Sequence, residues 1–149
     1  MDILVISIAN PILIGVYEDK KLIQTFTQDG KSSDIIPKIF SEISKQYAMK
    51  RLFYVNAPGS YMAIKVAYVF LKTLSIAKKI PLYASNGFNF NQNSPIKALG
   101  KKYFIYNNGE INLEFIHEDE KIENFMLPLH LDETIFSTNN LPQYNLPAV

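Results

Sequence analysis

Apolar residues in the first 86 positions follow two different periods. Five short runs rich in β-branched and aromatic residues end at turn-forming residues, which predicts strands at 3–8, 12–17, 22–27, 52–55 and 82–84. Between the third and fourth runs, apolar residues recur at helical spacing, at Ile36, Ile39, Phe40, Ile43 and Tyr47. A second helix is expected over 61–77. This order of elements predicts an α/β domain with one mixed sheet that begins with an antiparallel hairpin.

The expected helix over 61–77 is apolar almost all the way round. It contains neither Gly nor Pro, and its only charged residues, Lys65 and Lys72, share a stripe with Tyr61 and Tyr68. A helix with so little polar surface is buried on more than one side. One side faces its own sheet, and the other needs a neighbouring helix or another chain, so a core helix and a subunit interface both stay open. The two lysines argue against a membrane span of ~20 apolar residues.

Helical angles assign a role to each side of this helix. Small residues permit close approach, so we expect the side that packs on the sheet to carry Ala63, Ala67, Phe70, Thr73, Leu74 and Ala77. The flanks are expected to meet the neighbouring helix and a partner; they carry Met62, Val66, Val69 and Ile76 on one side and Ile64, Leu71 and Ser75 on the other. The Tyr61, Lys65, Tyr68 and Lys72 stripe is then a polar rim.

After residue 85 the chain changes character. An Asn-rich stretch indicates a loop, and Asn108-Gly109 between two apolar runs predicts a hairpin. After a polar turn at 118–120, a further alternating run at 122–127 predicts another strand. From Pro128 we expect an extended or poorly ordered tail. We therefore predict three segments: an N-terminal lobe at 1–86, a linker at 87–100, and a reduced, mostly β second lobe with its tail at 101–149.

Composition narrows the class of protein. With 48% hydrophobic residues the chain can build a core, and without cysteine it has no disulfide, thiolate metal site or thiol nucleophile. No secretory signal is recognised at the start, so a cytoplasmic protein is expected. Residues 1–102 hold fourteen Lys/Arg and six Asp/Glu (+8), whereas residues 103–149 hold one and eight (−7). The asymmetry leaves open attraction between the two lobes or a charged partner.

Three segments resemble the TsaB (YeaZ) family. They are the opening MDILVISIANPILIGVYEDKKLI, the polar segment from Lys31 to Pro37, and APGSYMAIKVAYVFLKTLSIAKKIPLYA, which is similar to the family's GPGSFTGLR-type segment. The resemblance covers residues 1 to about 86 and identifies the chain as a divergent, shortened member. It implies a ribonuclease-H/actin-like lobe, and a non-catalytic partner in the bacterial synthesis of threonylcarbamoyladenosine (t6A) in tRNA.

The sequence lacks the groups that nucleotide hydrolysis requires. The family usually has Asp where Ser7 stands, no acidic residue lies between Val5 and Tyr17, and no Gly precedes Gly15. The two histidines, His117 and His130, form no metal-binding motif. Ser60 is not in a nucleophile elbow, and its hydroxyl is expected to cap the helix over 61–77. We predict no catalytic, cofactor-binding or metal-binding residue and no cofactor, while weak nucleotide binding stays open.

These observations predict a non-catalytic subunit of the t6A machinery that binds a catalytic, actin-like TsaD-type protein through its apolar helices. The resemblance implies the TsaE-type ATPase as a further partner, only indirect contact with tRNA, and no membrane. Alone, the chain is expected to form a homodimer. The expected interface residues are Met62, Lys65, Val66, Tyr68, Val69, Lys72 and Ile76. Two alternatives remain: a degenerate actin-like ATPase or kinase-like enzyme, and a free-standing homodimeric interaction protein.

Overall fold

The computed structural model describes residues 1–59, 61–98, 100–117 and 120–143. Its main sheet has the strand order β3-β2-β1-β4-β5. The elements of this part are β1 (Asp2–Ile6), β2 (Ile12–Glu18), β3 (Lys21–Gln28), α1 (Ser32–Gln46), β4 (Arg51–Ala57), α2 (Tyr61–Lys78) and β5 (Leu82–Asn86). Strands β1, β2 and β3 are antiparallel, whereas β4 is parallel to both β1 and β5. The predicted α/β fold with one mixed five-stranded sheet is confirmed.

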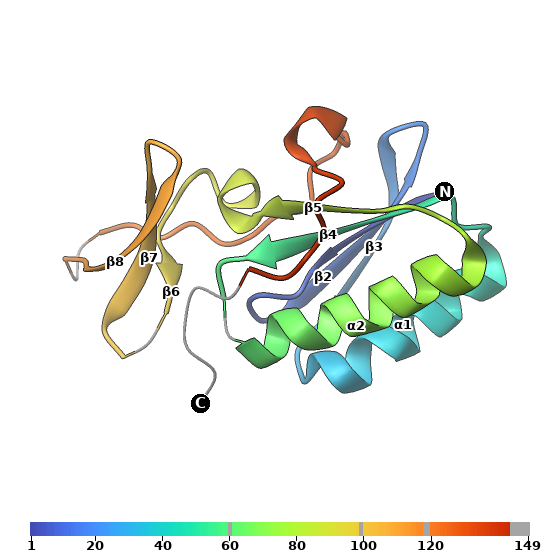
Figure 1. The fold of residues 1–149 in the computed structure, drawn as a ribbon, viewed down its shortest axis with the longest axis horizontal. Helices are drawn as coiled ribbons and strands as arrows, with labels where there is room; N and C mark the ends of the chain where they lie inside the picture. The colour runs from blue at the N-terminus through green and yellow to red at the C-terminus, as the bar shows by residue number, and fades with distance from the viewer. Residues whose placement is uncertain (60, 99, 118–119, 144–149) are drawn as a thin grey trace.

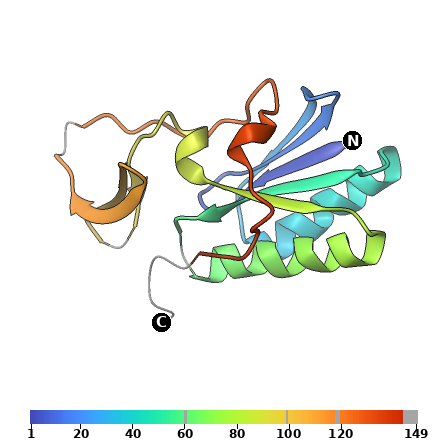
Figure 2. The same ribbon diagram turned by 45° about the horizontal axis from the view of Figure 1, so that its top comes forward.

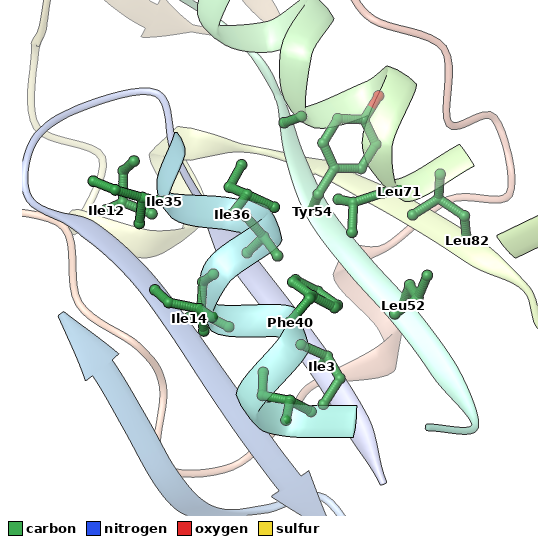
Figure 3. Close-up of a cluster of buried hydrophobic side chains, with 14 of the residues drawn as sticks. Ile3, Ile12, Ile14, Ile35, Ile36, Phe40, Leu52, Tyr54, Leu71 and Leu82 are labelled. Atoms are coloured by element: carbon green, nitrogen blue, oxygen red, sulfur yellow. The ribbon is translucent and has the colours of Figure 1, made fainter. Parts of the chain in front are cut away.

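Both long helices cover the same face of this sheet (Figure 1). The central strand β1 is buried on both faces, and its side chains alternate: Ile3 and Val5 point to the helices, Leu4 and Ile6 to the opposite face. The helix-side core unites residues of α1, α2 and the sheet; Figure 3 shows Ile36, Phe40, Tyr54 and Leu71 among them. A sheet buried on both faces accounts for the continuous apolar run of β1.

The opposite face of the main sheet is covered by the end of the chain. Its cluster consists of Leu4, Ile6, Tyr17, Phe53, Val55, Phe90 and Leu131, with Phe125, Leu127, Ile135 and Phe136 packed against it. Residues 120–143 return from the far end of the molecule and cross the strands of the main sheet, as Figures 1 and 2 show. An apolar sheet face has to be covered, and here an irregular strap covers it instead of a helix.

The alternation at 122–127 does not mark a strand, so this part of the prediction is wrong. Phe125 and Leu127 are half-buried against the main sheet, while Ile122 and Met126 are exposed. Two hydrogen bonds hold this segment in place: Met126 N donates to Phe90 O at 2.9 Å, and Glu123 N donates to Ser94 Oγ at 2.9 Å. Alternation of apolar and polar residues indicates an extended chain with one side buried. It does not indicate whether a neighbouring strand is present to form the backbone hydrogen bonds of a sheet.

Residues 128–143, expected to be extended or poorly ordered, form an irregular segment with one short 3-10 helix and hold defined contacts. The Tyr17 hydroxyl donates to the Pro128 carbonyl at 2.7 Å, and burial raises the pKa of Tyr17. Isolated bridges pair His130 with Lys21 and Ser137 with Ala84, on either side of η2 (Glu133–Ile135). Further on, Asn56 Nδ2 donates to Leu141 O at 2.8 Å. The strap is therefore anchored along its length; residues 144–149 of the predicted tail lie outside the described residues.

A second sheet stands apart from the first (Figure 2). Its order is β6-β7-β8, with β6 (Ile96–Lys97), β7 (Lys102–Asn107) and β8 (Glu110–Phe115). The predicted hairpin of β7 and β8 is confirmed. The stretch predicted as a linker contains η1 (Gly87–Phe90) and β6 in its described part, and Phe88, Ile96 and Phe104 form a small core of their own. The boundaries of the three predicted segments stay a prediction.

An ion-pair cluster fixes the strap at the edge where β1 and β4 begin. The Arg51 guanidinium donates through Nη2 to Asp2 Oδ2 at 2.6 Å and through Nη1 to Glu133 Oε1, and Lys20 Nζ lies 3.7 Å from Glu133 Oε2. These contacts join two strands to η2. The hydrogen bond from Arg51 holds the pKa of Glu133 below its ordinary value of 4.5.

This lowered pKa predicts a pH-dependent stability. The folded protein binds a proton at Glu133 more weakly than the unfolded chain does, so the contribution is present above pH 4.5 and is lost as the pH falls through the folded-state pKa. We expect Glu133→Gln to lower the melting temperature at neutral pH and to melt together with the wild type in acid. Thermal melts across the acid range measure this, with Glu42→Gln on the exposed side of α1 as the control. A Glu133→Gln deficit that is constant with pH would contradict the assignment.

Candidate partner-docking site

Helix α2 is long and regular, and its end is well defined. It contains no Gly or Pro, and at 1.5 Å per residue its eighteen residues extend about 27 Å. It stops where Lys79 adopts a left-handed conformation (φ 56°) and Ile80 N donates to Ser75 O at 3.0 Å, immediately before Pro81. The predicted cap, Ser60, and the side chain of Tyr61 lie outside the described residues.

The side of α2 that packs on the sheet carries Ile64, Ala67, Leu71 and Ser75, all of them buried. The sequence-based orientation is therefore wrong by about 100°, the rotation of one residue. Of the predicted sheet-facing residues, Ala67 is buried, whereas Thr73 and Ala77 are exposed. The expectation rested on small residues facing the sheet. Instead, branched side chains fill the space above it, because burying large apolar surface is the stronger contribution.

Helix α1 closes one flank of α2. Its buried residues are Ile35, Ile36, Ile39, Phe40 and Ile43. The rings of Phe40 and Phe70 meet edge to face, with centroids 5.3 Å apart. Half-buried Phe70 and Leu74 thus belong to the contact between the helices and not to the sheet side. The predicted neighbouring helix is present, on one flank only.

The outward side of α2 carries a straight apolar stripe. Met62, Val69 and Ile76 are exposed by 62%, 52% and 67%, and their seven-residue spacing aligns them within about 40° around the helix axis. Val66 lies beside them and is half-buried. These four residues, hereafter the α2 stripe, are the flank that the sequence assigned to a partner, and the structure exposes three of them.

An apolar groove of about 540 Å³ adjoins the α2 stripe. It runs between the two helices, and α1 contributes Ser32, Ser33 and Pro37 to its wall. The α2 residues along it are Met62, Lys65, Val66, Val69, Phe70, Thr73, Leu74 and Ala77. Sequence reasoning assigned no role here to the first turns of α1, because the exposure of Pro37 beside the buried Ile36 is known only from the structure. Stripe and groove together form an apolar strip along the helix pair.

The residues of the predicted polar rim do not share one environment in the structure. Lys65 is exposed and lines the groove, whereas Lys72 is half-buried and is not among the residues that line it. Tyr68 is half-buried and packs on the helix-side core, with its ring centroid 6.3 Å from that of Tyr54. Tyr68 thus acts mainly as a core residue. If the predicted orientation of α2 is rotated by one residue about the helix axis, Tyr68 comes to lie on the buried side.

The end of β1 forms a different kind of site. Ser7 is buried and, with Ile8, Ala9 and Asn10, lines a pocket of about 420 Å³ that reaches the first turns of both helices. Asn10 Oδ1 accepts from Gly30 N at 3.3 Å, which ties the loop after β1 to the start of α1. Among the residues described, no carboxylate lines this pocket. It therefore presents hydroxyl and amide groups, and none of the carboxylates with which proteins usually hold the magnesium of a nucleotide.

The two histidines lie in separate parts of the molecule. His117 follows β8 in the second sheet, whereas His130 bridges to Lys21 beside the main sheet. In the described ranges no three His, Cys, Asp or Glu side chains gather as metal ligands would. None of the helices in those ranges has the length and hydropathy of a membrane-spanning segment.

Comparison with known proteins finds similarity in structure and none in sequence. No family model and none of the curated proteins matches this chain. The structure superposes on YeaZ from Pseudomonas aeruginosa with a TM-score of 0.61 at 10% identity, covering 76% of this chain and 63% of that one. A structure described as an uncharacterized protein with similarity to peptidase YEAZ from Pseudomonas aeruginosa gives 0.54 at 10% identity, covering 76% and 62%. The fold is therefore YeaZ-like, and the chain spans less than two thirds of either protein.

Proposed function

We propose that this chain is a non-catalytic subunit of the machinery that makes t6A in tRNA, and that it binds a catalytic TsaD-type protein through α1 and α2. One observation carries the proposal: on a YeaZ-like fold, the α2 stripe stays exposed beside a carbon-lined groove. Contiguous exposed apolar surface marks interaction sites in soluble proteins. The proposed interface residues are those expected from the sequence, Met62, Lys65, Val66, Val69, Lys72 and Ile76, with Tyr68 supporting them from the core.

The spacing of the stripe favours a helical partner. Residues seven apart drift by only about 20° per step around a straight helix, which suits helices crossing at about +20°. Two helices from each protein would then pack as a four-helix arrangement around the groove. The stripe has the rim expected of an interface, since Lys65 and Lys72 lie three or four residues from members of the stripe and therefore beside it on α2.

The same surface supports a homodimer as the second candidate. An apolar stripe on one helix can pair with itself about a twofold axis. We propose that the chain dimerises when it is alone and that the TsaD-type partner replaces the second copy. A TsaE-type ATPase would join the assembled complex in the cytoplasm, and the chain would meet tRNA only indirectly, through its partner.

Reconstitution tests this function against the enzymatic alternative. The chain is mixed with the TsaD-type protein from the same cells, the threonylcarbamoyl donor and tRNA, and t6A is quantified by nucleoside mass spectrometry. We expect t6A only when both proteins are present, and no phosphate release from magnesium-ATP by the chain alone, because the pocket at Ser7 offers no carboxylate among its described residues. If the isolated chain hydrolyses ATP and Ser7→Ala abolishes this activity, the degenerate enzyme is favoured. If the same amount of t6A forms with and without the chain, the subunit role is refuted.

A further inference from the structure

Strand β8 forms an open edge of the second sheet. It is the outer strand of the order β6-β7-β8, at the end of the molecule farthest from the middle of α2 (Figures 1 and 2). The turn before it is tight: Asn108 and Gly109 both have positive φ, 51° and 79°, and Asn107 pairs with Glu110. This turn fixes the register of the hairpin and therefore which backbone groups of β8 face outward.

Three residues of β8 direct their backbone groups away from β7. In an antiparallel pair, residues alternate between exchanging hydrogen bonds with the partner and pointing outward, and a two-residue turn starts the series with a bonded pair. Glu110, Asn112 and Glu114 are thus bonded to β7, and Ile111, Leu113 and Phe115 present N–H and C=O groups at the edge. Elsewhere in the described chain, no backbone or side-chain group hydrogen-bonds to these three residues.

The side chains of β8 divide in the same alternation. Ile111, Leu113 and Phe115 lie on the face that continues from the buried Phe104, and Leu113 and Phe115 are 40% and 70% exposed. Glu110, Asn112 and Glu114 are exposed on the other face. A strand added to the edge would therefore meet apolar side chains on one face and carboxylates on the other.

The charges on β8 indicate which side chains an added strand would carry. In the described parts of the chain, Glu110 and Glu114 form no ion pair. Lys97 shares their face from β6, two strands away, whereas Lys102 lies on the apolar face with Nζ 5.5 Å from the Phe115 ring centroid. Exposed edges are usually protected by charged side chains, lysine above all, by proline or by a bulge. Strand β8 has no lysine, proline or bulge, and its two charged residues, Glu110 and Glu114, lie on one face only.

We propose that β8 binds an extended segment of another protein as a fourth strand, in which apolar residues alternate with Lys or Arg. The outward backbone groups supply the hydrogen bonds, Leu113 and Phe115 the apolar contact, and Glu110 and Glu114 the charge selection. A second copy is a poor occupant, because its β8 would bring two more glutamates and no Lys or Arg to the face that carries Glu110 and Glu114, so that carboxylates meet opposite or diagonally across the ladder. This site is independent of the helix pair.

A peptide-binding measurement tests the proposal. The probe is a fluorescein-labelled peptide of alternating Lys and Val flanked by Thr, titrated with the full chain and followed by anisotropy. The control peptide has the same composition with its lysines and valines in separate blocks. We expect the alternating peptide to bind at least about tenfold more tightly, and to weaken as ionic strength is raised from about 0.05 to 0.3 M.

Two kinds of variant separate edge pairing from general attraction. Leu113→Pro removes an outward N–H while keeping the ladder to β7, because proline is tolerated where the N–H faces solvent. We expect it to weaken peptide binding about tenfold, and Leu113→Thr less than about threefold. The Glu110→Lys/Glu114→Lys double variant leaves the backbone unchanged and is expected to abolish preference for the basic peptide, so the proposal stays testable if the proline variant does not fold.

Three outcomes would overturn the proposal. Equal affinity of the folded Leu113→Pro and Leu113→Thr variants would show that the edge is not used. Equal affinity for the alternating and block peptides would show attraction by charge alone. Concentration-dependent association of the chain that Leu113→Pro abolishes, and that the α2 variants leave unchanged, would identify a second copy as the occupant.

Discussion

Val69→Asp is expected to abolish the proposed complex with a TsaD-type protein and the proposed homodimer, while the chain itself stays folded. Val69 is 52% exposed in the middle of the α2 stripe, so a carboxylate is hydrated in the free chain. In the complex the same carboxylate would be desolvated without a partner, which costs about 3 kcal/mol or more, a loss of roughly a hundredfold or more in affinity. Sedimentation velocity of the mixture and of the chain alone measures both losses.

Two matched variants show whether position matters. Ile23→Asp makes the same kind of change at an exposed residue of β3, 43% accessible and away from the helices, and should leave association unchanged. Lys72→Ala removes a charge from the side of α2 beyond the stripe, and should change affinity by less than about 1 kcal/mol because rim charges mainly alter the association rate. Should Lys72→Ala separate the proteins while Val69→Asp leaves them together, the partner meets the other side of α2.

Leu131→Ala is expected to cost about 2–4 kcal/mol of unfolding free energy. Leu131 is 3% exposed and packs with Leu4, Ile6 and Phe53 on the sheet face opposite the helices. Truncation leaves a cavity beneath the strap and removes an apolar anchor that Leu131 N reinforces by donating to Lys20 O at 2.8 Å. Because the strap is the cover of that face, its loss exposes the central strands.

The neighbouring Leu129 is the natural control. It is 73% exposed, so Leu129→Ala should change the free energy of unfolding by less than about 0.5 kcal/mol. Urea denaturation of both variants, followed by far-ultraviolet circular dichroism, gives the comparison. Equal costs for the two substitutions would mean that the strap does not bury Leu131 in solution.

The local sequence pattern was sufficient to predict the helices and strands, but it was insufficient to predict which face of each helix is buried. An apolar run, a turn and a helical period are properties of neighbouring residues, so the strands and both helices of the main sheet were predicted close to their limits. The rotation of α2 about its own axis was predicted wrongly, because a helix that is apolar on nearly every side has almost no amphipathic pattern from which to infer its buried side. Only the packing of Ile64 and Leu71 on the sheet, and of Phe70 on Phe40, fixes which residues stay exposed.

The sequence by itself determined the α/β order, the mixed sheet, the hairpin at Asn108-Gly109 and the absence of an Asp at Ser7. The tertiary structure alone decided that residues 120–143 cover the second face of the main sheet and that Arg51 holds Glu133 there. It also decided that Met62, Val69 and Ile76 form the open stripe. The reason is physical. An alternating or apolar segment indicates that it must be buried, but the residues that bury it can lie more than a hundred positions away along the chain, as Pro128 does from Tyr17. No local periodicity contains that information.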